Sequence, residues 1–270
     1  MSREETAAMI DFVKLGGSLI TDKTQAYTPR QEIIARLAGE VRAALDTDPG
    51  LRLLLGHGSG SFGHWAAEPY GTQEGVVTPA EWRGYAEVAA SAGRLNRIVT
   101  DAFLEAGVPV LSLQPSASAC CHDGQVTHLS SRPIVEALKN GLVPLVYGDV
   151  ALDDVRGGTI ASTEDLFVYL SGRLRPARIL LFSGVPGVLD QDDQVIPRIT
   201  PATYPSWRNV LSGSRDVDVT GGMLDKVARM VDVVRGNPRT TVRILTGTEP
   251  GLLARVLLGE EPLEGTIISG

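Results

Sequence analysis

The stretch Gly56-His57-Gly58-Ser59-Gly60-Ser61-Phe62-Gly63-His64 decides the fold of this chain. It follows a short apolar run, Leu51 to Leu55, which has the length and composition of a buried strand. Four glycines within eight residues leave few side chains between the backbone and an approaching group. We therefore expect a strand-to-helix loop whose N–H groups face an anion, with a phosphate as the favoured ligand. A tight turn that binds nothing is the alternative.

Part of this stretch, Gly58-Ser59-Gly60-Ser61-Phe62-Gly63, also matches the dinucleotide fingerprint G-x-G-x-x-G. That fingerprint needs support from a second strand that ends in Asp or Glu roughly twenty residues later. The residues that follow instead run through Glu68-Pro69-Tyr70-Gly71 into a helical pattern. We therefore set a Rossmann dinucleotide site aside.

Size and composition indicate a globular α/β protein. The 270 residues are enough for one large domain or two modest lobes, and the 43% hydrophobic but 5% aromatic content predicts a mainly aliphatic core. No apolar run reaches the length of a membrane span, and the charged N-terminus does not resemble a signal peptide. The only cysteines, Cys120 and Cys121, are adjacent and cannot join distant segments. We therefore expect a cytoplasmic protein without a membrane partner.

The chain has fewer basic than acidic residues, and most of its basic residues are arginines. The net charge of −7 argues against nucleic acid as a partner. Only four of the 25 basic residues are lysines, namely Lys14, Lys23, Lys139 and Lys226. A compact ammonium differs physically from a guanidinium fork, so a lysine in an arginine-rich chain suggests a specific task. All but Lys139 lie in or beside glycine-rich or turn-like segments, which makes chance a weaker explanation for those three.

Two further glycine-rich turns accompany the first. The strand Ile10 to Leu15 leads into Lys14-Leu15-Gly16-Gly17-Ser18, and Val219-Thr220-Gly221-Gly222-Met223 opens a helix that carries Lys226. Gly16 and Gly17 permit close approach by a ligand, whose charge Lys14 and Lys23 can neutralise. A plain strand-end turn with solvated lysines is the alternative.

The rest of the chain alternates between strand and helix patterns. Helical spacing is expected over residues 29–45, 79–104 with a break near Gly93, 131–138, 163–174 and from Met223 onward. Further strands are expected at 108–113, 142–147, 177–183, 242–245 and 266–268, with a hairpin within 150–160 and a long loop at 197–218. Pro176 marks a lobe boundary that separates residues 1–175 from residues 176–270.

This alternation predicts an α/β fold with a mostly parallel central sheet. In such a sheet the carboxyl ends of the strands and the N-termini of the helices converge along one edge, where ligands bind. The loops 14–18, 56–64 and 220–223 should therefore meet there, as expected if two phosphorylated groups are brought end to end.

The sequence lacks the signatures of several other chemistries. It has no G-x-x-x-x-G-K-[ST] loop, no protein-kinase H-R-D or D-F-G set, no metal-ligand spacing of His and Cys, and no nucleophile elbow around a triad. Phosphoryl transfer depends mainly on positioning and electrostatic stabilisation, which Lys14, Lys23, Lys226 and Mg²⁺ could supply. A phosphate acceptor is already ionised near neutral pH, so His64 would bind it rather than remove a proton.

These motifs resemble the amino acid kinase superfamily. The resemblance rests on residues 14–18 with Lys23, the loop 56–64, Asp149, Ser162 to Asp165 and Thr220 to Lys226, and it covers nearly the whole chain in order. Within that superfamily, the ending Gly60-Ser61-Phe62-Gly63-His64 is most similar to the isopentenyl phosphate kinases.

The resemblance implies an open αβα sandwich that is usually a homodimer. It implies an N-terminal lobe, residues 1–175, that binds the acceptor and holds the dimer interface, and a C-terminal lobe, residues 176–270, that binds the nucleotide. The implied reaction is the ATP-dependent conversion of isopentenyl phosphate, a small phosphate monoester, to isopentenyl diphosphate, with Mg²⁺ as cofactor.

The resemblance also implies roles for individual residues. Lys14, Gly16, Gly17 and Ser18 hold the ATP phosphates, and Lys23 stabilises the transition state. Ser59 and His64 meet the acceptor phosphate, Gly148 lies near the acceptor, and Gly60 meets ATP. Asp165 organises the lysines, and Ser183, Gly222 and Lys226 lie on the nucleotide side. No protein ligand to the metal is assigned.

Ser59 departs from the family pattern, in which glycine is expected at this position, and its side chain would either crowd the acceptor or bond to it. The nearest rival is a fosfomycin kinase, which shares the histidine-ended loop but acts on a phosphonate. A rival of another class is a nucleotide-sensing regulatory module on the same fold, against which the intact lysines argue.

Several residues keep two interpretations. Asp165 begins a helix, so it either complements the helix dipole or orients lysines or a metal. Tyr70, Trp82, Tyr85 and Val88 either line an apolar pocket beside His64 or pack in the core. Cys120 and Cys121 are expected to be small buried residues, and His57, His122 and His128 to be structural or solvated.

Overall fold

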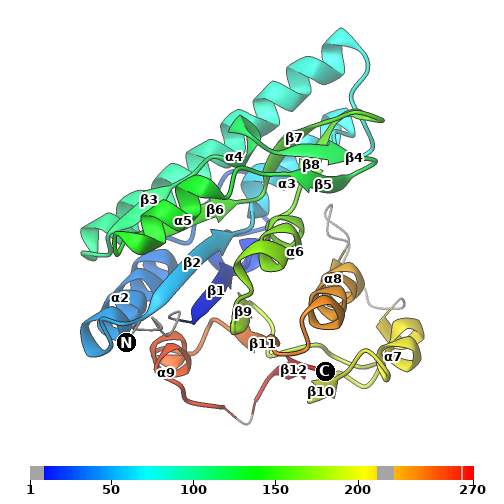
Figure 1. Cartoon of the computed structure of the whole chain (residues 1–270). Coiled ribbons are helices and arrows are strands. Elements are labelled where there is room, and N and C mark those ends of the chain that lie inside the picture. The colour runs from blue at the N-terminus through cyan, green and yellow to red at the C-terminus, as the bar shows by residue number, and fades with distance from the viewer. Residues whose placement is uncertain (1–8, 212–221, 263) are drawn as a thin grey trace, which may run out of the picture.

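The structure is a computed structural model that describes residues 9–211, 222–262 and 264–270. Its main feature is an eight-stranded sheet with the strand order β10-β12-β11-β9-β1-β2-β6-β3 (Figure 1). Every neighbouring pair in it is parallel except β11 with β12. A smaller sheet, β5-β4-β7-β8, stands beside the long helix α4 at one end of the molecule. The predicted mostly parallel α/β fold is confirmed.

The main-sheet strands have the bounds β1 Ile10–Leu15, β2 Arg52–His57, β3 Val110–Ser112, β6 Val143–Tyr147, β9 Arg178–Ser183, β10 Arg198–Ile199, β11 Thr241–Thr246 and β12 Thr266–Ile268. The small sheet consists of β4 Cys120–His122, β5 Gln125–His128, β7 Asp149–Asp153 and β8 Gly157–Ala161. The helices are α1 Gly17–Ile20, α2 Gln31–Thr47, α3 Gly60–Ala67, α4 Pro79–Glu105, α5 Arg132–Lys139, α6 Thr163–Leu174, α7 Tyr204–Leu211, α8 Gly222–Gly236 and α9 Leu252–Leu257, with 3-10 turns η1 Glu68–Tyr70 and η2 Pro115–Ala117.

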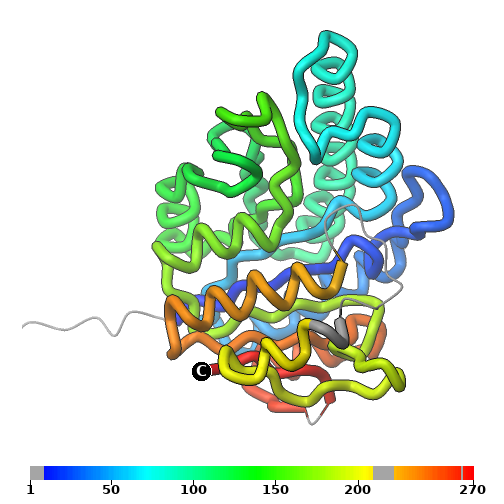
Figure 2. Tube along the Cα trace, turned by 90° about the vertical axis from the view of Figure 1, so that its right-hand side faces the viewer, coloured from blue at the N-terminus to red at the C-terminus, as the bar shows by residue number. Residues whose placement is uncertain are grey.

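Successive side chains of each strand point to opposite faces of the main sheet, and apolar side chains on both faces are covered by helices. Phe12 on β1 belongs to a buried cluster with α5, α6 and α8, whereas Val13 and Leu15 belong to a second cluster with α2, α4 and α9. Figures 1 and 2 show these helices on opposite sides of the strands. The same alternation turns Lys14 toward α6, and this orientation places its ammonium group in the site.

Both cores extend across the lobe boundary proposed at Pro176. Strand β9, which follows that boundary, pairs with β1 along five residues. Each of the two clusters also draws residues from both sides of position 176, for example Leu54 with Leu181 and Val41 with Leu253. One sheet and two shared cores thus join the two parts of the chain.

Local signals explain several helix ends. Thr78 and Glu81 form the predicted N-terminal cap of α4, in which Glu81 N–H donates to Thr78 Oγ1 at 3.3 Å. The break expected near Gly93 is wrong, since α4 runs unbroken from Pro79 to Glu105. Buried residues at helical spacing, such as Val88, Leu95 and Val99, hold α4 against the sheet and keep it continuous.

Two other expectations need correction. The long loop expected at 197–218 is wrong for its first part, because β10 and α7 lie within it, and residues 212–218 lie outside the described part of the chain. The hairpin β4–β5 was missed in the sequence, whereas the hairpin β7–β8 lies where it was expected. Each of these strands has five residues or fewer, so sequence periodicity gives little signal.

None of the helices in the described residues is both long enough and apolar enough to cross a membrane.

Candidate active site

The carboxyl ends of neighbouring strands meet at one edge of the main sheet, as predicted. Backbone bonds join the residues that follow these strands: Gly16 N–H donates to Phe182 O at 2.7 Å, and Gly58 N–H donates to Leu15 O at 3.0 Å. Farther along the edge, Gly148 N–H donates to His57 O at 3.0 Å. The loops after β1, β2 and β6 are therefore fixed to one another before any ligand binds.

The glycine loops touch backbone to backbone. A Cβ atom on Gly17 would lie 2.5 Å from the Gly60 nitrogen, and a Cβ on Gly60 would lie 2.1 Å from Thr21 Oγ1. Gly60 also has a φ of +50°, which side-chain-bearing residues rarely adopt. Only glycine fits at these positions, so the density of glycines in residues 56–64 reflects close packing of two loops as well as ligand access.

Four helices begin at this edge and present their first residue to it. The starting residues Gly17 of α1, Gly60 of α3 and Thr163 of α6 line one cavity, and Gly222 of α8 lines the adjoining one. Unpaired N–H groups and the helix dipole give such ends partial positive charge. An acidic protein thereby gains a local preference for anions without adding basic side chains.

We call the first of the two cavities the His64 cavity. Its lining combines charged groups with glycine backbone and a small apolar end: Lys14, Gly17, Ser18, Lys23, Gly58, Ser59, Gly60, Gly63, His64, Ala67, Val88, Ala92, Gly148, Asp149, Ile160, Ser162, Thr163 and Glu164. The apolar end is formed by Ala67, Val88, Ala92 and Ile160. A ligand that fits this cavity carries an anionic head and a short apolar tail.

The second, which we call the Lys226 cavity, is polar. It is lined by Lys14, Gly16, Gly17, Ser18, Glu164, Gly222, Lys226 and Arg229. Four of these residues, Lys14, Gly17, Ser18 and Glu164, also line the His64 cavity. The two cavities therefore adjoin, and two anions bound in them would meet beside the Lys14 ammonium.

Lys14 and Glu164 form a buried ion pair at this junction. The Lys14 ammonium contacts a Glu164 carboxylate oxygen, and both side chains are nearly inaccessible to water. Burial by itself raises the pKa of Glu164, but the charges of Lys14 and Lys226, together with hydrogen bonds to the carboxylate, lower it to about 2. Glu164 is thus ionised at neutral pH and holds the Lys14 ammonium in place.

Asp165 has different partners. Its carboxylate accepts hydrogen bonds from the Ser162 backbone N–H at 3.0 Å and hydroxyl at 2.6 Å, and it pairs with the Arg229 guanidinium. Asp165 lines neither the His64 cavity nor the Lys226 cavity. Of this acidic pair at the helix start, Glu164 is the residue that contacts Lys14, and sequence reasoning gave it no role.

The remaining predicted residues divide as follows. Lys23, Ser59, His64 and Gly148 line the His64 cavity, and Gly16, Gly222 and Lys226 line the Lys226 cavity. Ser183 lines neither; its buried hydroxyl donates to Val185 O at 3.2 Å. The segment Thr220-Gly221 lies outside the described residues.

His57 is structural, as one interpretation predicted. The ring is fully buried and stacks on Tyr147 at 5.5 Å between centroids. Its Nδ1 lies 3.0 Å from Gly58 O, and its Nε2 lies 3.1 Å from the side-chain nitrogen of Asn96. A neutral imidazole satisfies both contacts, donating through Nδ1 and accepting through Nε2. Burial, aided by the charge of Lys14, lowers the pKa of His57 to about 4 and keeps it neutral.

Ser59 takes up space that Gly63 leaves free. A Cβ atom on Gly63 would lie 2.1 Å from Ser59 Oγ and 2.6 Å from Ser59 Cβ. The serine side chain thus packs over the first turn of α3. Its hydroxyl forms no cap hydrogen bond with that helix.

Other sequence expectations have mixed outcomes. Val88 lines the His64 cavity, but Tyr70, Trp82 and Tyr85 do not. Trp82 and Tyr85 instead pack against each other, with ring centroids 5.3 Å apart. The alternative interpretation, core packing, fits Tyr85, which packs against a buried cluster, but not Trp82, which is exposed.

The burial of the two cysteines and of the two remaining histidines can be compared directly with the sequence predictions. Cys121 is buried as expected, but Cys120 is exposed, because successive residues of strand β4 point to opposite faces. His122 and His128 are exposed, as predicted.

Comparison with known proteins agrees with this geometry. Residues 9–245 match the model of the Amino acid kinase family. The isopentenyl phosphate kinase of Methanocaldococcus jannaschii is 34% identical, over 96% of this chain and 98% of that protein, and the enzyme of Haloferax volcanii is 37% identical over the same shares. A crystal structure of isopentenyl phosphate kinase superimposes with a TM-score of 0.81 at 32% identity, covering 96% of this chain and 100% of the other. The chain therefore belongs to the amino acid kinase family, in the group of the isopentenyl phosphate kinases.

Proposed function

We propose that this chain transfers a phosphoryl group from ATP to isopentenyl phosphate, giving isopentenyl diphosphate and ADP. One observation carries the proposal: the polar Lys226 cavity adjoins a cavity that has His64 at its polar part and a small apolar end. The names of the relatives support the same reaction and do not favour the alternatives, a fosfomycin kinase or a nucleotide-sensing module.

In this proposal the acceptor lies in the His64 cavity. His64 and the loop backbone around Ser59 bind its phosphate, near Gly148, and the apolar end receives its five-carbon tail. Gly60, which the resemblance assigns to ATP, lines the His64 cavity and not the Lys226 cavity. The exposed face of His64 and its distance of 4.0 Å from the Glu68 carboxylate leave the imidazole free to turn toward a phosphate. No general base is required, because the acceptor oxygen is already ionised near neutral pH.

The donor phosphates lie in the Lys226 cavity. Gly16, Gly17 and Ser18 offer the amino end of α1, and Lys14 and Lys226 approach from β1 and α8. Charge that develops on the transferring group lies next to Lys14, with Lys23 on the acceptor side. Phosphoryl transfer gains mainly from such fixed positive charge and alignment.

Mg²⁺ is part of the proposal as a partner of the nucleotide. No group of three potential His, Cys, Asp or Glu ligands gathers among residues 9–211, 222–262 and 264–270. This fits a metal held chiefly by phosphate oxygens and water, with at most one carboxylate such as Glu164 beside it. Bound there, the ion would neutralise phosphate charge.

The division into an acceptor lobe, residues 1–175, and a nucleotide lobe, residues 176–270, is also a proposal. Gly222 and Lys226, which line the proposed nucleotide cavity, come from residues 176–270 and support this division. Lys14 and Ser18, which line both cavities, come from residues 1–175. A cytoplasmic location is proposed as well. Fractionation of the producing cells would test the location.

A homodimer completes the proposal. The exposed side chains of Leu104, Leu111 and Leu142 lie near β3, which ends the main sheet, and they would be covered by a second copy. Light scattering on a sizing column should give twice the 28.7 kDa of one chain, and a mass of 28.7 kDa would refute the dimer.

A coupled assay of ADP release tests the reaction. It offers isopentenyl phosphate, dimethylallyl phosphate, fosfomycin, acetylglutamate and UMP side by side, each with and without EDTA. We expect release with isopentenyl phosphate, and none once EDTA removes Mg²⁺. His64→Ala serves as a control and should weaken use of the acceptor far more than binding of ATP. Release with fosfomycin alone would overturn the proposal.

A further inference from the structure

The apolar end of the His64 cavity lies between two walls that are distant in sequence. Ala67 of α3 with Val88 and Ala92 of α4 form one wall, and Ile160 of β8 belongs to the other. Figure 2 shows the helical wall in cyan and the hairpin wall in green, rising beside each other from the same end of the molecule. The separation between these walls sets the width of the apolar end.

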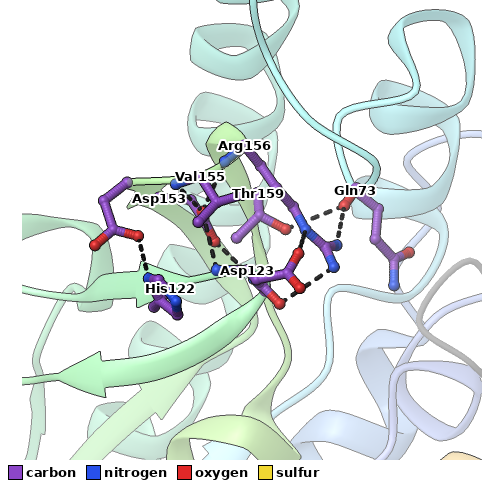
Figure 3. Close-up of polar contacts among 9 residues, drawn as sticks. Gln73, His122, Asp123, Asp153, Val155, Arg156 and Thr159 are labelled. Carbon is purple, nitrogen blue, oxygen red and sulfur yellow. Dashed lines mark hydrogen bonds and ion pairs between the residues drawn. The ribbon is translucent and has the colours of Figure 1, made fainter.

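A short segment links the two walls. Residues 71–78, here called the strap, connect η1 to α4. Val76 N–H donates to Arg156 O at 2.8 Å, and Gln73 O accepts from Thr159 Oγ1 at 3.1 Å and from Arg156 Nη1 at 3.3 Å. Thr159 directly precedes Ile160. The strap is therefore bonded to the strand that supplies the second wall (Figure 3).

The Arg156 guanidinium also holds a third segment. Its Nε donates to Asp123 Oδ1 at 2.9 Å, and its Nη2 donates to Asp123 O at 3.1 Å, at the tip of the β4–β5 hairpin (Figure 3). The buried Asp153 carboxylate accepts four backbone N–H bonds from the two hairpin tips, at 2.7 to 3.2 Å. These bonds outweigh burial and lower the pKa of Asp153. Arg156 thus extends from a rigid base.

The fit between strap and hairpin is tight. A Cβ atom on Gly157, where φ is +76°, would lie 2.2 Å from Val76 O. Val76 itself is buried. The close contact prevents the strap from moving toward the hairpin, and the bond from Val76 N–H to Arg156 O opposes movement away from it.

We propose that Arg156 is a positioning residue for the acceptor: by tying the strap to both hairpins it fixes the width of the apolar end of the His64 cavity. The inference rests on the proposed function, because it takes that end as the place of the acceptor tail. None of the segments that Arg156 joins lines the Lys226 cavity. Loss of the guanidinium should consequently affect the acceptor and spare the nucleotide.

The test compares Arg156→Ala with a matched control, Arg42→Ala. Both arginines are 32% exposed and pair with one aspartate. Arg156 also bonds to the backbone carbonyls of Gln73 and Asp123, whereas Arg42 binds Asp46 and the Gly107 carbonyl, away from both cavities. We expect Arg156→Ala to raise the KM for isopentenyl phosphate about tenfold, with kcat and the KM for ATP changed by less than about twofold. Arg42→Ala should leave both KM values unchanged.

Arg156→Lys provides a graded case. A lysine keeps the charge beside Asp123 but cannot also reach Gln73 O with a planar fork, so its KM for the acceptor should lie between those of the parent and the alanine variant. An unchanged acceptor KM in Arg156→Ala, or equal rises for acceptor and ATP, would overturn the inference.

Amide hydrogen exchange separates this inference from the proposed function. If the parent protein fails to use isopentenyl phosphate, the function fails, but faster exchange in residues 71–78 and 157–161 of Arg156→Ala would still show that Arg156 holds the walls together. If the parent is active and exchange in those segments is unaltered by the substitution, the positioning role is wrong.

Discussion

Ser59 and Gly63 are matched to each other at the start of α3. The family resemblance predicts glycine at position 59, yet this chain has serine, and the space for its side chain exists because residue 63 has no Cβ. The departure is therefore accommodated within the loop, by contact with Gly63.

Gly63→Ala should consequently be costly only when Ser59 is present. In the parent we expect a loss of about 1–3 kcal/mol in the free energy of unfolding, because the new methyl meets Ser59 Oγ. In a Ser59→Gly background the same change should be neutral, or stabilising by up to about 1 kcal/mol, as for glycine to alanine in a helix.

Urea denaturation of the four proteins measures this coupling. Gly39→Ala on α2, where a Cβ atom would meet nothing within 4 Å, is the control and should be stabilising in both backgrounds. An equal cost of Gly63→Ala in the two backgrounds would show that the two residues do not interact.

The neighbouring carboxylates Glu164 and Asp165 should differ sharply when neutralised. Glu164→Gln leaves the buried Lys14 charge without its partner, so we expect turnover to fall at least about a hundredfold and stability to drop by about 3–5 kcal/mol. Asp165→Asn loses a negative charge at a helix cap and in the ion pair with Arg229, a change of about 1–2 kcal/mol, and turnover should stay within about twofold. Glu164→Asp keeps the charge if the glutamine variant does not fold.

Steady-state kinetics of the purified variants decide between the two carboxylates. A large loss in Asp165→Asn with little loss in Glu164→Gln would support Asp165 as the residue that organises the lysines, the role that the family resemblance implies.

At the scale of elements, a loop that carries a lysine is anchored by one aromatic ring. Residues 22–28 hold Lys23 beside the His64 cavity. Tyr27 has a φ of +52°, its ring meets the edge of Phe62 at 5.8 Å, and the Arg94 guanidinium lies 5.7 Å above it. The loop thus leans on α3 and α4, and an unfavourable backbone conformation is maintained by these contacts.

Substitution of Tyr27 should therefore act through Lys23. Tyr27→Asn tolerates the positive φ but removes the ring, and we expect turnover to fall about tenfold with little change in the KM for ATP. Tyr27→Phe keeps the ring contacts and should retain turnover. Steady-state assays at saturating ATP give turnover, and a series of ATP concentrations gives the KM for ATP. Full activity of Tyr27→Asn would mean that the loop does not need the tyrosine ring as an anchor.

At the scale of the whole molecule, His57 makes stability depend on pH. The folded protein binds this proton only below about pH 4, whereas the unfolded chain binds it near 6.5. The unfolded state holds more protons between these values, so stability should fall as pH drops from 6.5 toward 4, by on the order of 3 kcal/mol from this residue.

The difference between the parent and His57→Gln is the quantity to measure by urea denaturation across pH 4 to 7. Burial raises the pKa of Asp149, which acts in the opposite direction, so the parent's slope alone does not report on His57. The parent should lose more stability than His57→Gln over this range, and His128→Gln should behave as the parent. Parallel curves for parent and His57→Gln would contradict the assignment.

Much of the fold and part of the site could be predicted from sequence because the signals are local. Apolar runs marked β1, β2, β6 and β9, and the Thr78 cap marked α4. The glycines of 16–17 and 58–60 pointed to close backbone approach. Which of Glu164 and Asp165 contacts Lys14 could not be predicted from sequence, because one residue along a helix turns the side chain by about 100° and only packing shows which carboxylate faces Lys14.

The strand–helix alternation, the glycine loops and the few lysines could be read from the sequence. Together they predicted a mostly parallel sheet with an anion-binding site at one edge. Only packing in three dimensions showed which distant residues meet: Lys14 with Glu164, and Arg156 with Gln73 and Asp123. The physical reason is that periodicity and turn chemistry act over a few residues, whereas these contacts depend on how strands align and helices pack across 33 to 150 positions.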